Sequence, residues 1–523
     1  MKYRFLFFNL FLFCVCKSYC QTTIPVDIVK LSKITLAKSP IIKRNLLSVT
    51  NAEANFQIQK STFDYQLVSG FSLNRNASNL FEADPRNEFI SDQLKLKNSG
   101  ISIGLQKTLR SSLRASLSID YINVKDNFPY NRFSQNVGAY FQDHTVSSTF
   151  SLTQPILRGR GNKIATALEK ASKLNIESTN ENAEFSNSFE LLQTGSSYWQ
   201  YVAAYKSLKI FKENEARVRR VLEITQELVK ADKRPAGDLA QVLADLANQE
   251  RQTKVAEQSL YTAKINLGRS IGLNKGDTKQ LGDPTDEFPV IEESKYSKNF
   301  NETKFLEIAQ NNRKDIMASK KIQEALELQF DLAENNKKPQ LDLAGFVSYG
   351  GMNMGNGLER ALATFSQNEG RTIGYGMSLS LTFPVNNNLA RGRYIQNEIA
   401  LRDQKVSNDN LIRNIDLNVS NALNNLRTSV EALVKSKQSF KFYQQVFSNE
   451  QVKFKNGLTI LLNLIQFQER LTFAELEYLR AHQQFALAIL NLRYETGTLL
   501  AHKKGIIRIK KNLFYTIPTV IND

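Results

Sequence analysis

The feature that most constrains this chain is an alternating stretch from Ile373 to Phe383, which reads IGYGMSLSLTF. Large apolar residues occupy every second position, and glycine, serine or threonine occupies the positions between them. A period of two places the large side chains on one face of a β-strand and the small ones on the other. Eleven residues is also the length that a tilted strand needs to cross a bilayer. The stretch therefore predicts a membrane-type strand that stops before Pro384, because proline donates no hydrogen bond to a sheet.

A long helical pattern follows this strand, from about Leu389 to Lys455. At 1.5 Å per residue such a helix is about 100 Å long, and it needs partners to cover its apolar stripe. A strict period of seven predicts a left-handed coiled coil, whereas helices in a globular core rarely keep that period over six heptads. The residues that recur at this interval are Ile412, Val419, Leu426, Leu433, Phe440, Phe447 and Phe454.

The same plan of a strand followed by a long helix occurs earlier in the chain. The motif Ser-Leu-Thr-x-Pro stands at 151–155 and again at 380–384, and an Arg-Gly-Arg follows each copy. Further matches align at a larger offset before the strands than at the strand ends, so the first half holds 46 extra residues among its strands. Matches in this order predict an internal duplication.

These patterns divide the chain into five parts. They are a signal peptide (1–20), a first helix–strand–helix–helix repeat (21–273), a polar linker (274–300), a second repeat (301–500) and a basic tail (501–523). The first repeat places strands within 63–155 and a long helix at 159–233, and the second places strands at 340–350 and 371–384 and a long helix at 389–455. Helices are also expected at about 27–62, 238–270, 302–337 and 458–497, and loops at 75–98, 123–145 and 350–357.

The first 20 residues have the pattern of a secretory signal. Lys2 and Arg4 precede an apolar core, and the small residues Ser18 and Cys20 come just before the expected cut. A lipid on Cys20 remains the alternative, although the three residues before it match a lipoprotein signal poorly. All three cysteines of the chain lie in this segment, so a chain cut after residue 20 has no disulfide, reactive thiol or cysteine metal site.

Several classes of function are disfavoured by composition and motif content. The three histidines are scattered, and no nucleophile elbow, P-loop or zinc-protease motif occurs, so we expect no enzyme, no cofactor and no metal site. The net charge of +17 is spread along the helices with one cluster in the tail, which is typical of a solvated surface. With an export signal in place, no nucleic-acid partner is expected. Past residue 20 there is no run of 18 apolar residues, so transmembrane helices are not expected either.

The chain resembles the TolC-like family of outer-membrane channels over nearly its whole length after residue 20. The resemblance rests on the duplicated plan, the two strand ends and the stretch Thr153 to Gly159, TQPILRG, which is similar to the family's T-Q-P-L-L-R-G. At the second helical turn, Gly457-Leu458-Thr459 is similar to the family's G-L-[ST] tip, where an adaptor protein docks. Two positions depart from the family. Asn463 stands where an aspartate is usual, and the first turn carries Pro235 and lacks G-L-[ST].

The resemblance implies a mixed α/β membrane protein that works as a homotrimer. Each chain would give strands to one shared transmembrane β-barrel, continuous with a long periplasmic α-helical coiled-coil barrel, in the cell outer membrane and extending into the periplasm. It would be the passive exit duct of a tripartite efflux or type I secretion system, with a periplasmic adaptor, an inner-membrane pump and outer-membrane lipid as partners. The residues this assigns are the adaptor-contact tips Gly237, Asp238, Gly457, Leu458 and Thr459, and the strand-to-helix junctions Pro155 and Pro384.

Alternatives remain open at this point. A structural coiled-coil protein of the envelope, without a pore, would explain the heptads but not the alternating strands. The extra 46 residues would give either an 18-stranded barrel or surface loops above a 12-stranded one. Gly457 is expected in a left-handed conformation, in a plain hairpin loop or in a docking tip. Neither the exported substrate nor the particular pump and adaptor can be read from the residues.

Overall fold

The computed structural model describes residues 24–88, 93–127, 141–291, 301–355, 357–366, 371–503 and 506–518. The expected signal peptide and Cys20 lie outside these ranges. The chain divides into two compact units, one of residues 1–46, 183–314 and 412–523 and the other of residues 47–182 and 315–411. None of the helices in the described ranges combines the length and the apolar character that crossing a membrane requires.

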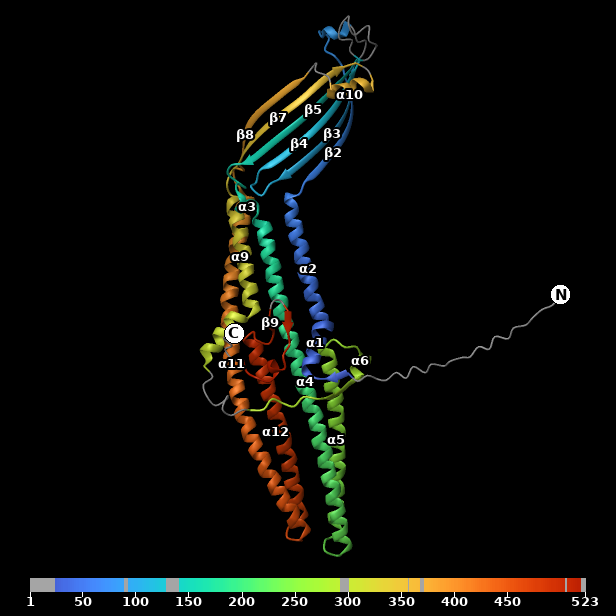
Figure 1. Cartoon of the computed structure of the whole chain (residues 1–523), viewed down its shortest axis with the longest axis vertical. Helices are drawn as coiled ribbons and strands as arrows, with labels where there is room; N and C mark the ends of the chain where they lie inside the picture. Colours follow the sequence, from blue (N-terminus) through green and yellow to red (C-terminus); the bar gives the residue numbers. More distant parts are fainter. Residues whose placement is uncertain are drawn as a thin grey trace, which may run out of the picture. The chain divides into compact units, whose positions relative to one another are not determined.

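The second unit contains a six-stranded antiparallel sheet (Figure 1). The order in the sheet is β2-β3-β4-β5-β7-β8, so β2 and β8 are its two edges. Its strands are β2 (Gln66–Ser78), β3 (Leu94–Thr108), β4 (Arg114–Asp126), β5 (Phe141–Pro155), β7 (Gln340–Met354) and β8 (Thr372–Thr382).

The strands extend beyond the ranges expected from alternation. Residues 75–78 and 94–98 were expected in a loop, but they pair across the β2–β3 hairpin, with Arg75 opposite Lys97 and Asn76 opposite Leu96. The strands β4 and β5 likewise run into the expected 123–145 loop at both of its ends. Alternation detects only the part of a strand with one apolar face, whereas backbone pairing continues for any side chain.

The connection from β7 to β8 also differs from the expected glycine-rich loop. The strand β7 continues to Met354, and a helix, α10 (Leu358–Ser366), follows it. No periodicity over nine residues distinguished this helix in the sequence. Its burial comes from packing against the sheet, because Ala361 and Thr364 are buried.

Along the sequence, helices precede and follow the strands of the sheet. They are α1 (Ile28–Lys38), α2 (Pro40–Lys60), α3 (Asn162–Ala165), α4 (Ala167–Lys230), α5 (Gly237–Ser270), α6 (Lys275–Lys279), α8 (Glu302–Asn312), α9 (Lys314–Asn335), α11 (Asn388–Lys455) and α12 (Leu461–Glu495). The expected helix at 159–233 begins later than predicted, because Gly159 and Gly161 have φ values of 79° and 91° and Thr166 separates α3 from α4.

Two expected helices, at 27–62 and 302–337, are each broken once. Ser39 separates α1 from α2, and Arg313 separates α8 from α9, both with extended ψ angles of 128° and 121°. Each break lies against a glycine that ends another helix. A Cβ on Gly272 would come within 3.0 Å of the Lys38 carbonyl oxygen, and one on Gly497 within 2.9 Å of the Arg313 amide nitrogen.

The first unit has an apolar core in which distant segments of the chain meet. The strand β1 (Ile24–Val26) pairs in parallel with β6 (Leu281–Pro284). The expected linker at 274–300 therefore contributes α6, β6 and buried side chains, among them Asp286 and Phe288, to a folded part of the unit. Its polar composition gave no sign of this, because only the spacing of a few buried residues matters for packing. Other members of the core are Val26, Ile28, Leu191, Tyr198, Trp199, Leu267, Leu490 and Phe514.

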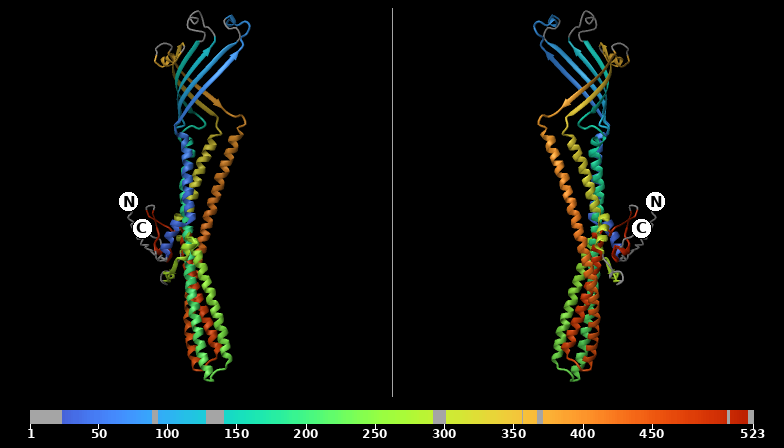
Figure 2. Two further views of the ribbon diagram at one scale, coloured as in Figure 1. Left: turned by 90° about the vertical axis from the view of Figure 1, so that its right-hand side faces the viewer. Right: turned by 90° about the vertical axis from the view of Figure 1, so that its left-hand side faces the viewer.

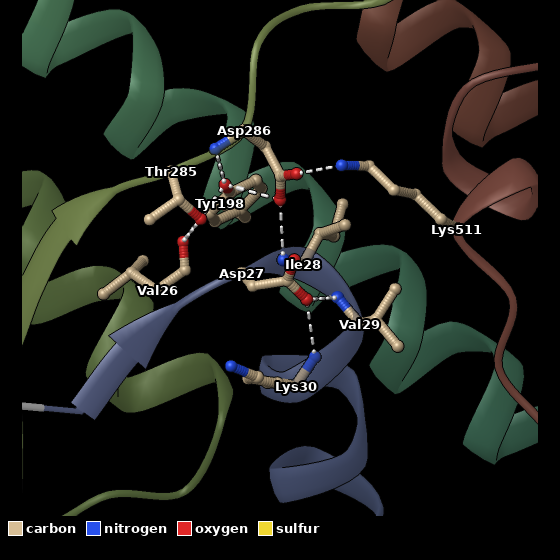
Figure 3. Close-up of polar contacts among 9 residues, drawn as sticks. All are labelled: Val26, Asp27, Ile28, Val29, Lys30, Tyr198, Thr285, Asp286 and Lys511. Carbon is tan, nitrogen blue, oxygen red and sulfur yellow. Dashed lines mark hydrogen bonds and ion pairs between the residues drawn. The ribbon is translucent and has the colours of Figure 1, made fainter.

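Asp286 ties three segments of this core together (Figure 3). Its carboxylate accepts hydrogen bonds from the Ile28 amide at 3.0 Å, the Tyr198 hydroxyl at 2.9 Å and the Lys511 ammonium at 2.6 Å. Burial by itself would raise the pKa of the Asp286 carboxyl, but the hydrogen bonds from Lys511, Ile28 and Tyr198 outweigh it and hold that pKa below its usual value.

The basic tail is part of this core and not simply a solvated cluster. It forms the hairpin β9 (Ala501–Lys503) and β10 (Ile506–Arg508) and then a 3₁₀ turn, with Phe514 fully buried. Arg493 on α12 donates to the carbonyl oxygens of Thr516 and Ile517. Lys510 and Lys511 are exposed, as expected of a solvated cluster, and Lys511 also pairs with the buried carboxylate of Asp286.

A second core in this unit joins the ends of four helices (Figure 2). It contains Val218 and Val221 of α4, Val242 and Leu246 of α5, and apolar residues of α11 and α12. Of the seven heptad positions on α11, five are buried (Val419, Leu426, Leu433, Phe447 and Phe454), Phe440 packs on the core and Ile412 is exposed.

Candidate functional site

The six-stranded sheet has two chemically different faces. Residues directly opposite each other on antiparallel strands point to the same side, so the register assigns every residue to a face. Leu105 lies opposite both Leu67 and Leu117, and Leu379 lies opposite Leu343. One side, here called the apolar face, carries Leu67, Phe71, Leu73, Ile101, Ile103, Leu105, Leu117, Ile119, Tyr121, Phe150, Leu152, Val347, Tyr349, Ile373, Tyr375, Met377, Leu379 and Leu381.

The other side, here called the small-residue face, is lined by glycine, serine and threonine. Large apolar residues interrupt it, Val68, Ile122 and Phe346 among the small residues and Leu94, Leu96, Val124, Met352 and Met354 toward one end of the sheet. A Cβ on Gly376 would come within 2.6 Å of the Phe346 ring, so this position can hold only glycine without displacing the ring. The small residues of this face include Gly70, Ser72, Ser102, Gly104, Ser116, Ser118, Thr149, Ser151, Ser348, Ser378, Ser380 and Thr382.

The apolar face is exposed in the single chain. The side chain of Tyr375 is 83% exposed, and Leu67, Phe71, Met377 and Leu379 are also largely exposed. A contiguous apolar surface of this extent marks a site that meets another apolar phase. The alternation predicted for 373–383 therefore holds for all six strands, and Leu379 and Ser380 lie on opposite faces as expected.

The two prolines expected at the strand-to-helix junctions lie at or just beyond strand ends. Pro155 is the last residue of β5 and is opposite Asp342, and Pro384 follows the end of β8 by two residues. After Pro155 the Ile156 amide still donates to the Leu341 carbonyl at 2.7 Å. Neither proline contributes a donor to the ladder, in keeping with its place at the strand end.

The second helical turn has the backbone expected of it. Gly457 has a φ of 73°, and the Leu458 amide donates to the Lys453 carbonyl at 2.9 Å, which closes the end of α11 in a Schellman arrangement. The Leu458 side chain is 75% exposed, and Ile460 and Leu462 beside it are also exposed. The turn thus presents a short apolar ridge.

Thr459 has a different environment from Leu458. Its hydroxyl bonds to the carboxylate of Glu450, a buried side chain on α11, and the Asn463 amide donates to the Thr459 hydroxyl at 3.2 Å. Asn463 stands at the position where the TolC-like family usually has aspartate, and its hydrogen bond to Thr459 stabilises the turn. A second negative charge at position 463 would face Glu450, whereas the neutral amide donates a hydrogen bond.

The first helical turn is linked to the second by Arg234. Its guanidinium donates to the Thr459 carbonyl and lies 5.1 Å from the Phe454 ring centroid. Gly237 is the first residue of α5, and the left-handed residue of this turn is Asp232, with a φ of 54°. Asp238 is half-buried, and its amide donates to the Pro235 carbonyl at 3.1 Å. No local pattern in the sequence indicates Arg234, because only the fold brings it to residue 459.

Within the described ranges no group of three or more His, Cys, Asp or Glu side chains is placed to hold a metal ion. The two-faced sheet and the two turns are thus the candidate functional surfaces.

The comparisons with known proteins agree with this geometry. Residues 305–498 match the model of the family described as outer membrane efflux protein. The family is one of channels and not of enzymes. A comparison with curated proteins finds no match.

Solved structures share the fold over nearly the whole chain. A membrane protein from Pseudomonas aeruginosa matches with a TM-score of 0.64 at 13% identity, covering 91% of this chain and 94% of that one. The outer-membrane channel OprN matches with a TM-score of 0.64 at 13% identity, covering 90% of each chain. The Campylobacter jejuni CmeC outer membrane channel matches with a TM-score of 0.62 at 15% identity, covering 90% and 85%. The predicted resemblance to TolC-like channels is confirmed, and so is a location in the outer membrane, extending into the periplasm.

Proposed function

We propose that this member of the outer membrane efflux protein family assembles as a homotrimer and serves as the passive exit duct of a tripartite efflux or type I secretion system. The observation that carries the proposal is the sheet, with one apolar face, one small-residue face and two unpaired edges, β2 and β8. In this proposal the apolar face meets lipid, and the small-residue face lines a water-filled lumen.

Closure of the sheet requires further copies of the chain. An open edge in hydrocarbon would leave a row of backbone N–H and C=O groups unsatisfied, at several kcal/mol each. Pairing of β8 of one chain with β2 of the next satisfies both edges at once. With six strands from each chain, three copies give a barrel of 18 strands, and the hairpin β3–β4 accounts for the strands that the first half has and the second lacks. An added hairpin in the first half is consistent with the duplication inferred from the sequence.

Conductance tests the proposed duct. Purified protein reconstituted in a planar bilayer should give discrete ionic current steps, and Ser380→Arg should lower their amplitude, because a charged side chain would enter the lumen. A preparation that is folded and membrane-inserted but carries no current would support the alternative of a structural coiled-coil protein of the envelope.

The second helical turn is proposed as the contact with the periplasmic adaptor. The support is the exposed ridge of Leu458, Ile460 and Leu462, held by Gly457 and by the inward bonds of Thr459. In this arrangement Leu458 meets the partner, Gly457 and Thr459 shape the turn, and Gly237 and Asp238 act through the neighbouring first turn.

Leu458→Asp is expected to abolish efflux while leaving the amount of assembled protein unchanged. The side chain is exposed in the single chain, so its replacement should alter stability by no more than about 0.5 kcal/mol. At a docking surface the new carboxylate would be buried without a partner. Assembled protein and export of a dye substrate should be measured in the same cells.

The matched controls are Leu458→Met and Lys455→Asp. The first keeps an apolar side chain at the ridge, and the second introduces an acid on an exposed residue three positions earlier. Both should export normally. Normal efflux by Leu458→Asp at normal abundance would leave the turn a plain hairpin loop.

A further inference from the structure

We propose that α10 (Leu358–Ser366) is a membrane-surface helix that lies on the outside of the barrel and inserts Leu358 and Leu362 into the outer leaflet at the headgroup boundary. The proposal rests on the assignment of the apolar face to lipid, and it adds a helix to the contact with the lipid interface. Figure 1 shows α10 beside the ends of β5 and β7.

The contacts of α10 show which face of the sheet it covers. A Cβ on Gly351 would come within 3.1 Å of the Thr364 carbonyl oxygen, so Gly351 points at the helix. Gly351 lies opposite Val146 and is two residues from Tyr349, and both of those belong to the apolar face. Val146 is buried, although most of this face is exposed. The helix therefore covers one end of the apolar face and not the lumen side.

The depth of this contact follows from the length of β7. From Leu341 to Gly351 the strand has eleven residues, and 9–11 residues of a tilted strand cross a bilayer. If the rows from Leu341 onward lie in hydrocarbon, Gly351 lies where the hydrocarbon ends. The helix that packs on Gly351 is therefore placed at the interface.

The side chains near α10 have the composition of a membrane interface. The Tyr121 hydroxyl is 2.8 Å from His144 Nδ1, His144 Nε2 is 3.1 Å from the Gly355 carbonyl oxygen, and the Arg371 guanidinium lies 5.9 Å from the Tyr349 ring centroid. Aromatic rings with polar tips, accompanied by cations, form the girdles of membrane barrels at headgroup level. This cluster lies at the end of the sheet that α10 covers.

One exposed side of α10 is apolar. Ala361 and Thr364 are buried, whereas Leu358 is 74% exposed and Leu362 is 61% exposed. Residues four positions apart lie on one side of a helix, so the two leucines form one exposed stripe. Glu359 lies on the side opposite the buried residues and Arg360 lies across the helix from the leucines, and both are exposed. A short helix with leucines on one side and charges on other sides, packed on a lipid-facing sheet, fits the boundary between headgroups and acyl chains.

Fluorescence quenching at single cysteines tests this placement in the full chain reconstituted into vesicles. Leu362→Cys, Leu379→Cys and Ser378→Cys are each labelled with an environment-sensitive fluorophore, and the labelled parent chain gives the background. Leu362→Cys should be quenched by lipid carrying a nitroxide near the headgroup, more than by lipid carrying it deep in the chain. Its quenching by aqueous iodide should be several-fold weaker than that of Ser378→Cys, on the small-residue face.

The two controls separate this inference from the proposed function. Leu379→Cys should be quenched by lipid-borne nitroxide and protected from iodide, since Leu379 lies on the apolar face within the rows placed in hydrocarbon. If Leu379→Cys behaves so while Leu362→Cys is as open to iodide as Ser378→Cys, α10 projects into water and the inference is overturned, with the duct intact. If Leu379→Cys escapes every lipid quencher, the lipid-facing assignment itself fails.

Discussion

Leu379→Arg should sharply reduce the yield of assembled trimer in the outer membrane. Leu379 lies on the apolar face of β8, opposite Leu343, and it is largely exposed in the single chain. An arginine facing lipid costs up to about 2–4 kcal/mol in each protomer, with the largest cost at the bilayer midplane. The measurement is the amount of heat-dissociable trimer in outer-membrane fractions, compared with total protein.

The neighbouring residue provides the control for this substitution. Ser380 is one position away on β8 and points to the small-residue face. Ser380→Arg introduces the same side chain at nearly the same depth, and we expect near-normal trimer with altered conductance. Equal trimer yields for Leu379→Arg and the parent chain would show that the two faces are assigned the wrong way round or that the sheet does not meet lipid.

Asp286→Ala should lower the free energy of unfolding by about 3 kcal/mol, the lower end of the range for breaking a buried charge pair. The Asp286 side chain is 2% exposed, so its removal leaves the Ile28 amide without its acceptor and leaves the Tyr198 hydroxyl only the longer bond to the Val26 carbonyl, at 3.3 Å. Lys511 loses its ion pair but suffers less, because its side chain is 55% exposed. Thermal unfolding of detergent-purified protein measures the change.

Asp283→Ala is the matched control for Asp286→Ala. Asp283 belongs to the same segment and is exposed, so the same chemical change should cost no more than about 0.5 kcal/mol. If both variants unfold at the same temperature as the parent chain, Asp286 does not hold the three segments together.

The lowered pKa of Asp286 makes its contribution to the free energy of unfolding depend on pH in the acid range. Because the carboxyl has a lower pKa in the folded chain than in the unfolded one, the unfolded chain binds more protons between those two values. The contribution of Asp286 is complete above the ordinary aspartate pKa of ~3.9, and it is lost as the pH falls below that value through the lowered one. The stability difference between the parent chain and Asp286→Ala should therefore shrink in acid.

The sequence predicted the strands best where one face is apolar and the other small. The stretch 373–383 anticipated both faces of β8, because alternation and the pleat of a strand have the same period. It missed the polar ends of β2 and β3, where Asn76 pairs with Leu96, and it missed α10. Backbone pairing at these strand ends depends on the partner strand, so the side chains of one strand do not predict it.

The tips show the same division. The sequence predicted the left-handed Gly457 correctly, since a turn between two helices needs a residue that tolerates positive φ. It could not predict that Thr459 bonds to Glu450 or that Arg234 reaches the Thr459 carbonyl from a turn more than 200 residues away. Whether Gly457, Leu458 and Thr459 contact an adaptor stays a prediction for the Leu458→Asp experiment.

By itself, the sequence determined the alternating strands, the heptad seam and the turn at Gly457, because each depends on a local period or a local backbone preference. The tertiary structure alone decided that the expected helix at 302–337 breaks at Arg313, where Gly497 of another helix approaches, whereas the break at Ser39 is favoured locally because Pro40 follows it. It also made an apparent linker and a basic tail into a core around Asp286. A buried carboxylate is stable only where donors from distant segments meet it, and that meeting is a property of the fold and not of any segment.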